Sequence, residues 1–502
     1  MTKKKFLSLL IIIAVLVSFP IYSNLRGIPK NWTLKEFQNQ KLKWQNCYGN
    51  FECSTLLAPV DYDKITSDVF HLKIIKFKAT DQRQKLGALI VNPGGPGASA
   101  FDYAYNAENI VSAAIREKYD IVGFDQRGVG QSDPIRCLTD KETDEMLAGP
   151  MIADTPENQR KIVENAKFFA SKCKKAAGYK LGHLSTFESA KDMELLRLTL
   201  NEPKLNYLGK SYGTYLGTLY ASLYPTKVGK MILDGAIDPT ISITEQNLAQ
   251  AHGFELALNQ FLVENKISKN LISNLFKKLR IEPLSTKSDR KLNDSLAILG
   301  VAYSLYDDVT GWPKLSMALS QALTGDGTSL LELSDEYSGR SKSGKFSSNE
   351  NDMSPIISCI DWSTSTGSIQ VIIPLQKFLT EAPIFGPYLA NSEIVCKHLL
   401  SSIVKRENNI HLAASNPVMI IGTTSDPATP YEWAAALSKS FHNSFLVTLV
   451  ADGHTGQGRR NPCIDGAVDR YLIDLRGSSR AITCARLVNS TTRNRARFTH
   501  AP

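Results

Sequence analysis

Short apolar runs alternate with amphipathic stretches along most of the chain, a pattern that predicts buried strands separated by helices. The run at residues 69–79 begins by alternating, with Phe70, Leu72 and Ile74 on one face and polar residues on the other. Most of the later runs are apolar and rich in β-branched residues, as expected for strands buried on both faces. The predicted strands span residues 60–64, 69–79, 86–91, 119–124, 205–208, 230–233, 417–421 and 444–450. Helical patterns between them, such as 190–200 and 216–222, predict a mostly parallel sheet flanked by helices.

Helical periodicity replaces this alternation between residues 241 and 411. The predicted helices span residues 245–264, 267–278, 291–305, 313–323 and 369–379. A polar stretch at 338–351, rich in Ser, Gly and Lys, predicts a loop or a mobile tip. A helical insertion between two strands of a sheet is typical of a lid, so we expect this segment to cover the sheet.

The composition is that of a globular protein. Hydrophobic residues make up 43% of the 502 residues and charged residues 21%, which excludes a disordered or fibrous chain. Lysine and arginine total 58 against 49 acidic residues, a net charge of +9. This mild excess is spread along the chain without a dense basic block, so nucleic acid is not an expected partner.

The two ends of the chain carry different signals. Three lysines at residues 3–5 precede an uncharged apolar run at 6–19, and Ser23 offers a small residue for cleavage. This arrangement predicts a signal peptide and a secreted or cell-surface, extracellular protein. The run is shorter than the ~20 residues that span a bilayer; an uncleaved membrane anchor is the alternative. The last residues are basic and predict a solvated tail.

Export makes the eight cysteines interpretable as disulfides. We expect neighbours in sequence to pair, because each pair then lies within one structural segment. Free buried thiols are the alternative. The expected bridges are Cys47–Cys53, Cys137–Cys173, Cys359–Cys396 and Cys463–Cys484.

The candidate nucleophile is Ser211, which follows a predicted strand and precedes a helical pattern. The surrounding residues read Gly209-Lys210-Ser211-Tyr212-Gly213, a G-x-S-x-G pattern. Glycines on both sides allow a sharp strand-to-helix turn that exposes the hydroxyl at the edge of the sheet. The N-terminus of the following helix favours developing negative charge.

A serine nucleophile needs a base and an orienting carboxylate, which follow it in the order acid then histidine in this architecture. Asp426 comes just after the predicted strand at 417–421, and His454 comes after the next strand in a glycine-flanked loop. Asp452 is a rival for the acid, although a turn role suits it better. The sequence therefore predicts a catalytic triad of Ser211, Asp426 and His454.

Two backbone amides are expected to stabilise the oxyanion. One is that of Tyr212, next to the serine, and the other lies in the glycine-rich loop 92–99. We choose Gly95 for this donor over its neighbour Gly94. In the loop after the next strand, Arg127 and Asp125 are expected to pair beneath the site and brace it; a substrate-binding role for Arg127 is the alternative.

No cofactor is predicted. Motifs for zinc proteases (HExxH), phosphate-binding loops (GxxxxGK[ST]) and EF-hands are missing from the sequence, and a hydrolytic triad works without a cofactor or metal.

Together these stretches resemble α/β-hydrolases related to proline iminopeptidases, and above all the secreted tripeptidyl aminopeptidases. The oxyanion loop reads NPGGPG, the entry to the sheet reads APVDYD, and the region of residues 312–337 and the motif IISCIDW resemble that family's lid. Cys463 soon after His454 is similar to the family's C-terminal TAP-like region. The resemblance implies an α/β-hydrolase fold with a largely helical lid inserted between sheet strands. The expected organisation is a signal peptide (1–23), the first part of the hydrolase core (34–240), the lid (241–411), the C-terminal part of the core (412–485) and a disordered basic tail (486–502).

The resemblance implies a serine exopeptidase that acts on peptides with free N-termini, of the tripeptidyl or prolyl aminopeptidase type. Such an enzyme needs a carboxylate that pairs with the substrate's α-ammonium group. The predicted lid offers several, of which Asp361 is preferred because a disulfide at Cys359 would fix its backbone. The others are Asp335, Glu336, Glu381 and Glu393. A secreted carboxylesterase or lipase with the same triad is the alternative.

Overall fold

The computed structural model describes residues 32–362, 375–399, 410–474 and 481–486. Within them a single ten-stranded sheet runs in the order β1-β2-β3-β5-β4-β6-β7-β8-β9-β10. In this order, the first three neighbouring pairs (β1–β2, β2–β3 and β3–β5) are antiparallel. All the following pairs, from β5–β4 to β9–β10, are parallel. The strands are β1 Gln45–Cys47, β2 Phe51–Pro59, β3 Val69–Phe77, β4 Gly87–Asn92, β5 Tyr119–Phe124, β6 Leu205–Lys210, β7 Val228–Asp234, β8 Val418–Ser425, β9 Ser444–Asp452 and β10 Ile482–Ala485.

The predicted strands agree with these bounds except at the N-terminal edge of the sheet. The strand predicted at 60–64 is wrong, because Asp61 accepts hydrogen bonds from the amides of Asp63 and Lys64 and turns the chain there. The preceding residues form β2 instead. The short edge strands β1 and β10 were not predicted; each pairs along only three or four residues.

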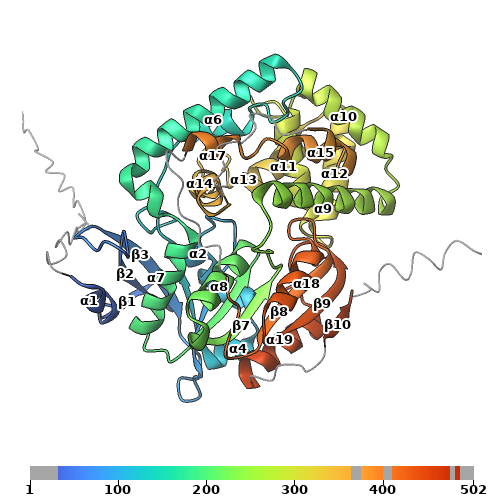
Figure 1. Ribbon diagram of the computed structural model, residues 1–502. Coiled ribbons are helices and arrows are strands. Elements are labelled where there is room, and N and C mark those ends of the chain that lie inside the picture. Colours follow the sequence, from blue (N-terminus) through green and yellow to red (C-terminus); the bar gives the residue numbers. More distant parts are fainter. Residues whose placement is uncertain (1–31, 363–374, 400–409, 475–480, 487–502) are drawn as a thin grey trace, which may run out of the picture.

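Helices cover both faces of the sheet (Figure 1). On one face, α7 Thr186–Thr199 and α8 Tyr212–Leu223 bury Met193, Leu196 and Leu216. The other face packs against α2 Ala100–Tyr105, α4 Ala113–Lys118 and α19 Pro462–Asp474. This three-layer arrangement buries the central strands on both sides, and their carboxyl ends meet at one edge.

The predicted lid is a helical layer above that edge (Figure 1). It has its own apolar core, which includes Leu258, Phe261 and Trp312. Residues 369–374 of a predicted helix lie outside the described residues, and α15 covers the rest. The lid helices are α9 Ile243–Glu264, α10 Lys269–Ile281, α11 Asp294–Leu305, α12 Gly311–Leu323, α13 Thr328–Ser338, α14 Glu350–Trp362, α15 Leu375–Glu381, α16 Gly386–Leu389 and α17 Ile394–Leu399.

Two helices from the earlier part of the chain join this layer. They are α5 Asp140–Leu147 and α6 Pro156–Ala177, and α6 lies beside α17 (Figure 1). Residues 339–349 form a loop between α13 and α14, as predicted for most of the stretch 338–351, whose ends belong to the two helices. Its end is held by buried Asn349, whose amide group donates to the carbonyls of Gly128 and Ile135. The covering layer is therefore built from two separate stretches of the chain.

All four predicted disulfides are present: Cys47–Cys53, Cys137–Cys173, Cys359–Cys396 and Cys463–Cys484. The third joins α14 to α17 within the lid. Among the described residues, every helix is too short or too polar to cross a membrane. The predicted signal peptide lies outside the described residues, as does the basic tail beyond Arg486.

Candidate active site

Ser211 occupies a tight turn between β6 and α8. Its backbone has φ of 52° and ψ of −125°, a conformation that costs energy for a residue with a side chain. A Cβ atom on Gly209 would lie 2.4 Å from the carbonyl oxygen of Gly213, so the turn leaves no room for a larger residue there. The amide of Ser211 donates to the carbonyl of Asp234 on the neighbouring strand, 2.9 Å away. The turn is thus held in its strained form by the sheet.

Asp426 and His454 lie in direct contact. The Nδ1 atom of His454 is 2.8 and 2.9 Å from the two carboxylate oxygens of Asp426. Asp426 is fully buried and also accepts hydrogen bonds from the amides of Ala428, Thr429 and Thr455. Burial by itself raises the pKa of Asp426, but His454 and these amides outweigh it, so the pKa lies below its ordinary value. The ionised carboxylate therefore holds the Nδ1–H tautomer of the imidazole.

The rival acid, Asp452, has a different partner. Asp452 is the buried last residue of β9, and its carboxylate accepts from the guanidinium of Arg486 at 3.0 Å. Of the two carboxylates, Asp426 is the one in contact with the imidazole of His454.

The glycine-rich loop lies directly against the nucleophile turn. A Cβ atom on Gly94 would meet Cβ of Ser211 at 2.9 Å and the amide nitrogen of Tyr212 at 3.2 Å. The Gly94 amide donates to the side chain of Asn92, 3.0 Å away, so it is already engaged. This favours Gly95 over Gly94 as the second oxyanion donor.

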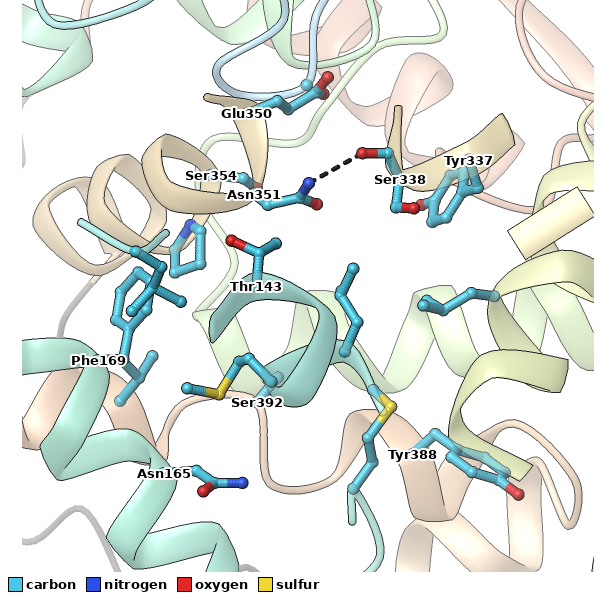
Figure 2. A pocket seen from close by; sticks show the side chains of 18 of the residues that line it. Thr143, Asn165, Phe169, Tyr337, Ser338, Glu350, Asn351, Ser354, Tyr388 and Ser392 are labelled. Atoms are coloured by element: carbon cyan, nitrogen blue, oxygen red, sulfur yellow. Dashed lines mark hydrogen bonds between the residues drawn. The ribbon is translucent and has the colours of Figure 1, made fainter. Parts of the chain in front are cut away.

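Two cavities meet at Ser211. The larger, about 770 Å³, is lined by Ser211, His454 and Gly95 together with residues of α5, α6 and the lid. Figure 2 shows this pocket, with Phe169 at the left, Glu350 at the top, Tyr337 at the upper right and Thr143 between them. The smaller cavity, about 400 Å³, is lined by Ser211, Gly95 and Tyr212 and by residues of α9 and α14. A group bound at Ser211 can therefore extend in two directions beneath the lid.

A family model described as "alpha/beta hydrolase fold" matches residues 87–458. The chain belongs to the α/β-hydrolase fold family. Serine protease Hip1 of Mycobacterium tuberculosis is 33% identical over 471 residues, covering 89% of each chain. Carboxylesterase B of the same organism is 33% identical over 452 residues, covering 86% of each chain. Tripeptidyl aminopeptidase of Streptomyces lividans is 28% identical over 474 residues, covering 88% of this chain and 86% of that protein.

One carboxylate of this α/β-hydrolase was not predicted as a site residue. Glu350, the first residue of α14, lines the larger cavity, and its Oε1 would lie 3.1 Å from a Cβ atom on Gly95. Burial raises its pKa to about 7. Among the described residues that line the two cavities, Glu350 and His454 alone have an acidic, basic or imidazole side chain. One feature of the sequence could have identified Glu350 as a site residue, because it is the first residue of the helix that carries the IISCIDW motif. The polar residues around it favour a loop instead.

The carboxylates expected to bind an amine have other surroundings. Asp361 accepts hydrogen bonds from the amide and hydroxyl of Thr186, and Asp335 pairs with Arg290 at 2.7 Å. The remaining three are engaged with neighbours or exposed. Glu336 pairs with Lys314, Glu393 is bonded by Asn247, and Glu381 is exposed on α15.

The expected pairing of Arg127 with Asp125 is wrong. Arg127 instead forms a bidentate ion pair with Asp192 on α7, with distances of 2.7 and 2.8 Å between fully buried groups. Asp125 accepts from the amides of Phe101 and Gln131. The side chains of Arg127 and Asp125 therefore bind different partners, although both residues belong to the same loop. Arg127 links this loop, at the end of a sheet strand, to α7.

Proposed function

We propose that this protein is a secreted serine exopeptidase that cleaves peptide bonds near free N-termini. The observation that carries the proposal is that His454, paired with the buried Asp426, lines the same lidded cavity as Ser211 and the carboxylate Glu350. The relatives named serine protease and tripeptidyl aminopeptidase support the peptidase reading. Four disulfides support export, because such bridges persist in oxidising compartments.

In the proposed mechanism Ser211 attacks the scissile carbonyl while His454 takes its proton. Asp426 keeps the imidazole oriented and stabilises its protonated form. The amides of Tyr212 and Gly95 donate hydrogen bonds to the developing oxyanion. His454 then gives the proton to the leaving amine, and a water molecule hydrolyses the acyl-enzyme by the reverse sequence of proton transfers.

Glu350 is the proposed site for the substrate's α-ammonium group. A carboxylate in a cavity whose described lining holds no lysine or arginine gains a charge-assisted hydrogen bond when an ammonium group binds. A capped N-terminus removes that partner and leaves the carboxylate desolvated, which costs on the order of 1–3 kcal/mol or more. Free peptide N-termini are therefore the expected substrates.

A secreted carboxylesterase is the second candidate, favoured by the relative named Carboxylesterase B. It uses the same triad, but it has no need of a carboxylate beside the oxyanion loop. The two candidates therefore differ in how they treat the substrate's charge.

The test compares one peptide anilide with and without an N-acetyl cap, alongside a p-nitrophenyl ester. The proposal expects acetylation to lower kcat/KM at least about tenfold in the wild type and to have little effect in Glu350→Gln. Equal rates for capped and free peptides, with fast ester hydrolysis, would favour the esterase. Mass spectrometry of the products gives the number of residues released.

A further inference from the structure

The loop that carries His454 is held from two sides. Its amides at residues 455–457 donate to carboxylates of the core, Asp426 and Asp234, at distances of 2.8 to 3.0 Å. The amide of His454 itself donates to the carbonyl oxygen of Tyr306, 2.8 Å away. Tyr306 directly follows helix α11 and thus belongs to the lid. The core therefore holds the imidazole and the loop beyond the histidine, and the lid holds the backbone amide of His454.

Tyr306 also contacts the imidazole with its side chain. Its ring meets that of His454 edge to face, with centroids 5.0 Å apart and planes at 81°. The neighbouring Gly453 has φ of 99°, and a Cβ atom there would lie 2.8 Å from the Tyr306 carbonyl oxygen. Only glycine allows this close approach of lid and loop.

A partly buried ion-pair cluster ties the same two segments together. Asp308, two residues after Tyr306, has a side chain only 3% exposed and pairs with Arg459 of the histidine loop. It also pairs with Arg486 at 2.9 Å, and Arg486 in turn binds Asp452 at 3.0 Å. The lid thus contacts this loop at two places. Asp308 binds Arg459, which follows His454, directly, and it reaches Asp452, which precedes His454, through Arg486.

We propose that residues 306–308, which we call the lid clasp, position His454 for catalysis, so that the lid completes the active site as well as covering it. The proposal rests on the proposed role of His454 as the base. The clasp supplies the backbone hydrogen bond and the ring contact of His454. The core supplies the contact of its Nδ1 atom with Asp426 and the hydrogen bonds of residues 455–457. A base displaced by about 1 Å can cost roughly a hundredfold in rate. Loosening the clasp therefore lowers catalysis even for substrates too small to use the lid cavity.

The test is Asp308→Asn, which removes the charge and keeps the shape of the side chain. The matched control is Asp144→Asn, because Asp144 on α5 also lies between two arginines, Arg340 at 2.6 Å and Arg290 at 3.7 Å, without contacting the histidine loop. Each variant is assayed for unfolding temperature, for hydrolysis of p-nitrophenyl acetate and for the rate of labelling by a small fluorophosphonate.

Asp308→Asn is expected to lower kcat for the small ester and the labelling rate at least tenfold, with KM changed less than twofold. For Asp144→Asn, kcat and the labelling rate are expected to stay within twofold of the wild-type values. Its unfolding temperature is expected to fall about as much as that of Asp308→Asn. Equal rates for the two variants would overturn the clasp. If Asp308→Asn does not fold, Arg486→Gln takes its place, because the side chain of Arg486 is 43% exposed. An activity loss of about threefold or more is then expected, and an unchanged rate overturns the proposal. Failure of the wild type to react with either reagent would instead refute the proposed triad.

Discussion

Replacing Glu350 with glutamine is expected to stabilise the protein while impairing its proposed function. Burial raises the pKa of Glu350 from its ordinary value of 4.5 to about 7. Between these pH values the folded state binds more protons than the unfolded state, so this group makes stability fall as pH rises. Each pKa unit corresponds to about 1.4 kcal/mol. The full penalty, reached above pH 7, is therefore on the order of 3 kcal/mol.

The linkage relation gives this penalty its pH dependence. At pH 5 it amounts to about 1 kcal/mol or less, and at pH 8 to about 3 kcal/mol. Glu350→Gln removes the ionisation while keeping the size of the side chain. The free energy of unfolding of the variant should therefore exceed that of the wild type only slightly at pH 5. At pH 8 this difference should be larger by about 2–3 kcal/mol.

The assay is guanidinium unfolding at the two pH values with the disulfides intact, followed by tryptophan fluorescence. Glu336→Gln is the control, because this lid carboxylate is about half exposed beside Lys314 and surface pairs of this kind contribute roughly 0–1 kcal/mol. A gain for Glu350→Gln that is the same at pH 5 and pH 8 would refute the reasoning, since only the ionisation makes the penalty depend on pH.

Further predictions concern the proposed triad and one disulfide. Ser211→Ala should lower kcat by several orders of magnitude with an unchanged unfolding temperature; near-normal turnover would contradict the nucleophile. Asp426→Asn should lower kcat about 10³- to 10⁴-fold, because the imidazole loses its orienting acceptor; a loss of less than tenfold speaks against this role. The bridge between Cys463 and Cys484 spans 21 residues, and its removal should lower the free energy of unfolding by about 3 kcal/mol. Denaturant unfolding measures this change. An unchanged midpoint would show that the bridge does not stabilise the fold.

The sequence by itself determined the features that depend on residues close together in the chain. Alternating strands and helices predicted the parallel sheet, and the glycines around Ser211 predicted the turn that exposes it. The order of motifs along the chain singled out Asp426 and His454, which the structure brings into contact; their catalytic roles stay a prediction. Pairing of cysteines that neighbour one another in sequence was also correct.

Only the tertiary structure decided which distant segments meet. The approach of Glu350 to Gly95, the partner of Arg127 and the joining of α6 to the lid all connect residues far apart in sequence. No local pattern encodes such contacts, because they arise when helices pack over the sheet. A carboxylate in a polar stretch looks solvated in sequence, and only its burial under the lid raises its pKa and makes it a candidate for binding an amine. The sequence therefore identified the chemistry expected at the edge of the sheet, and the packing of the lid decided what surrounds it.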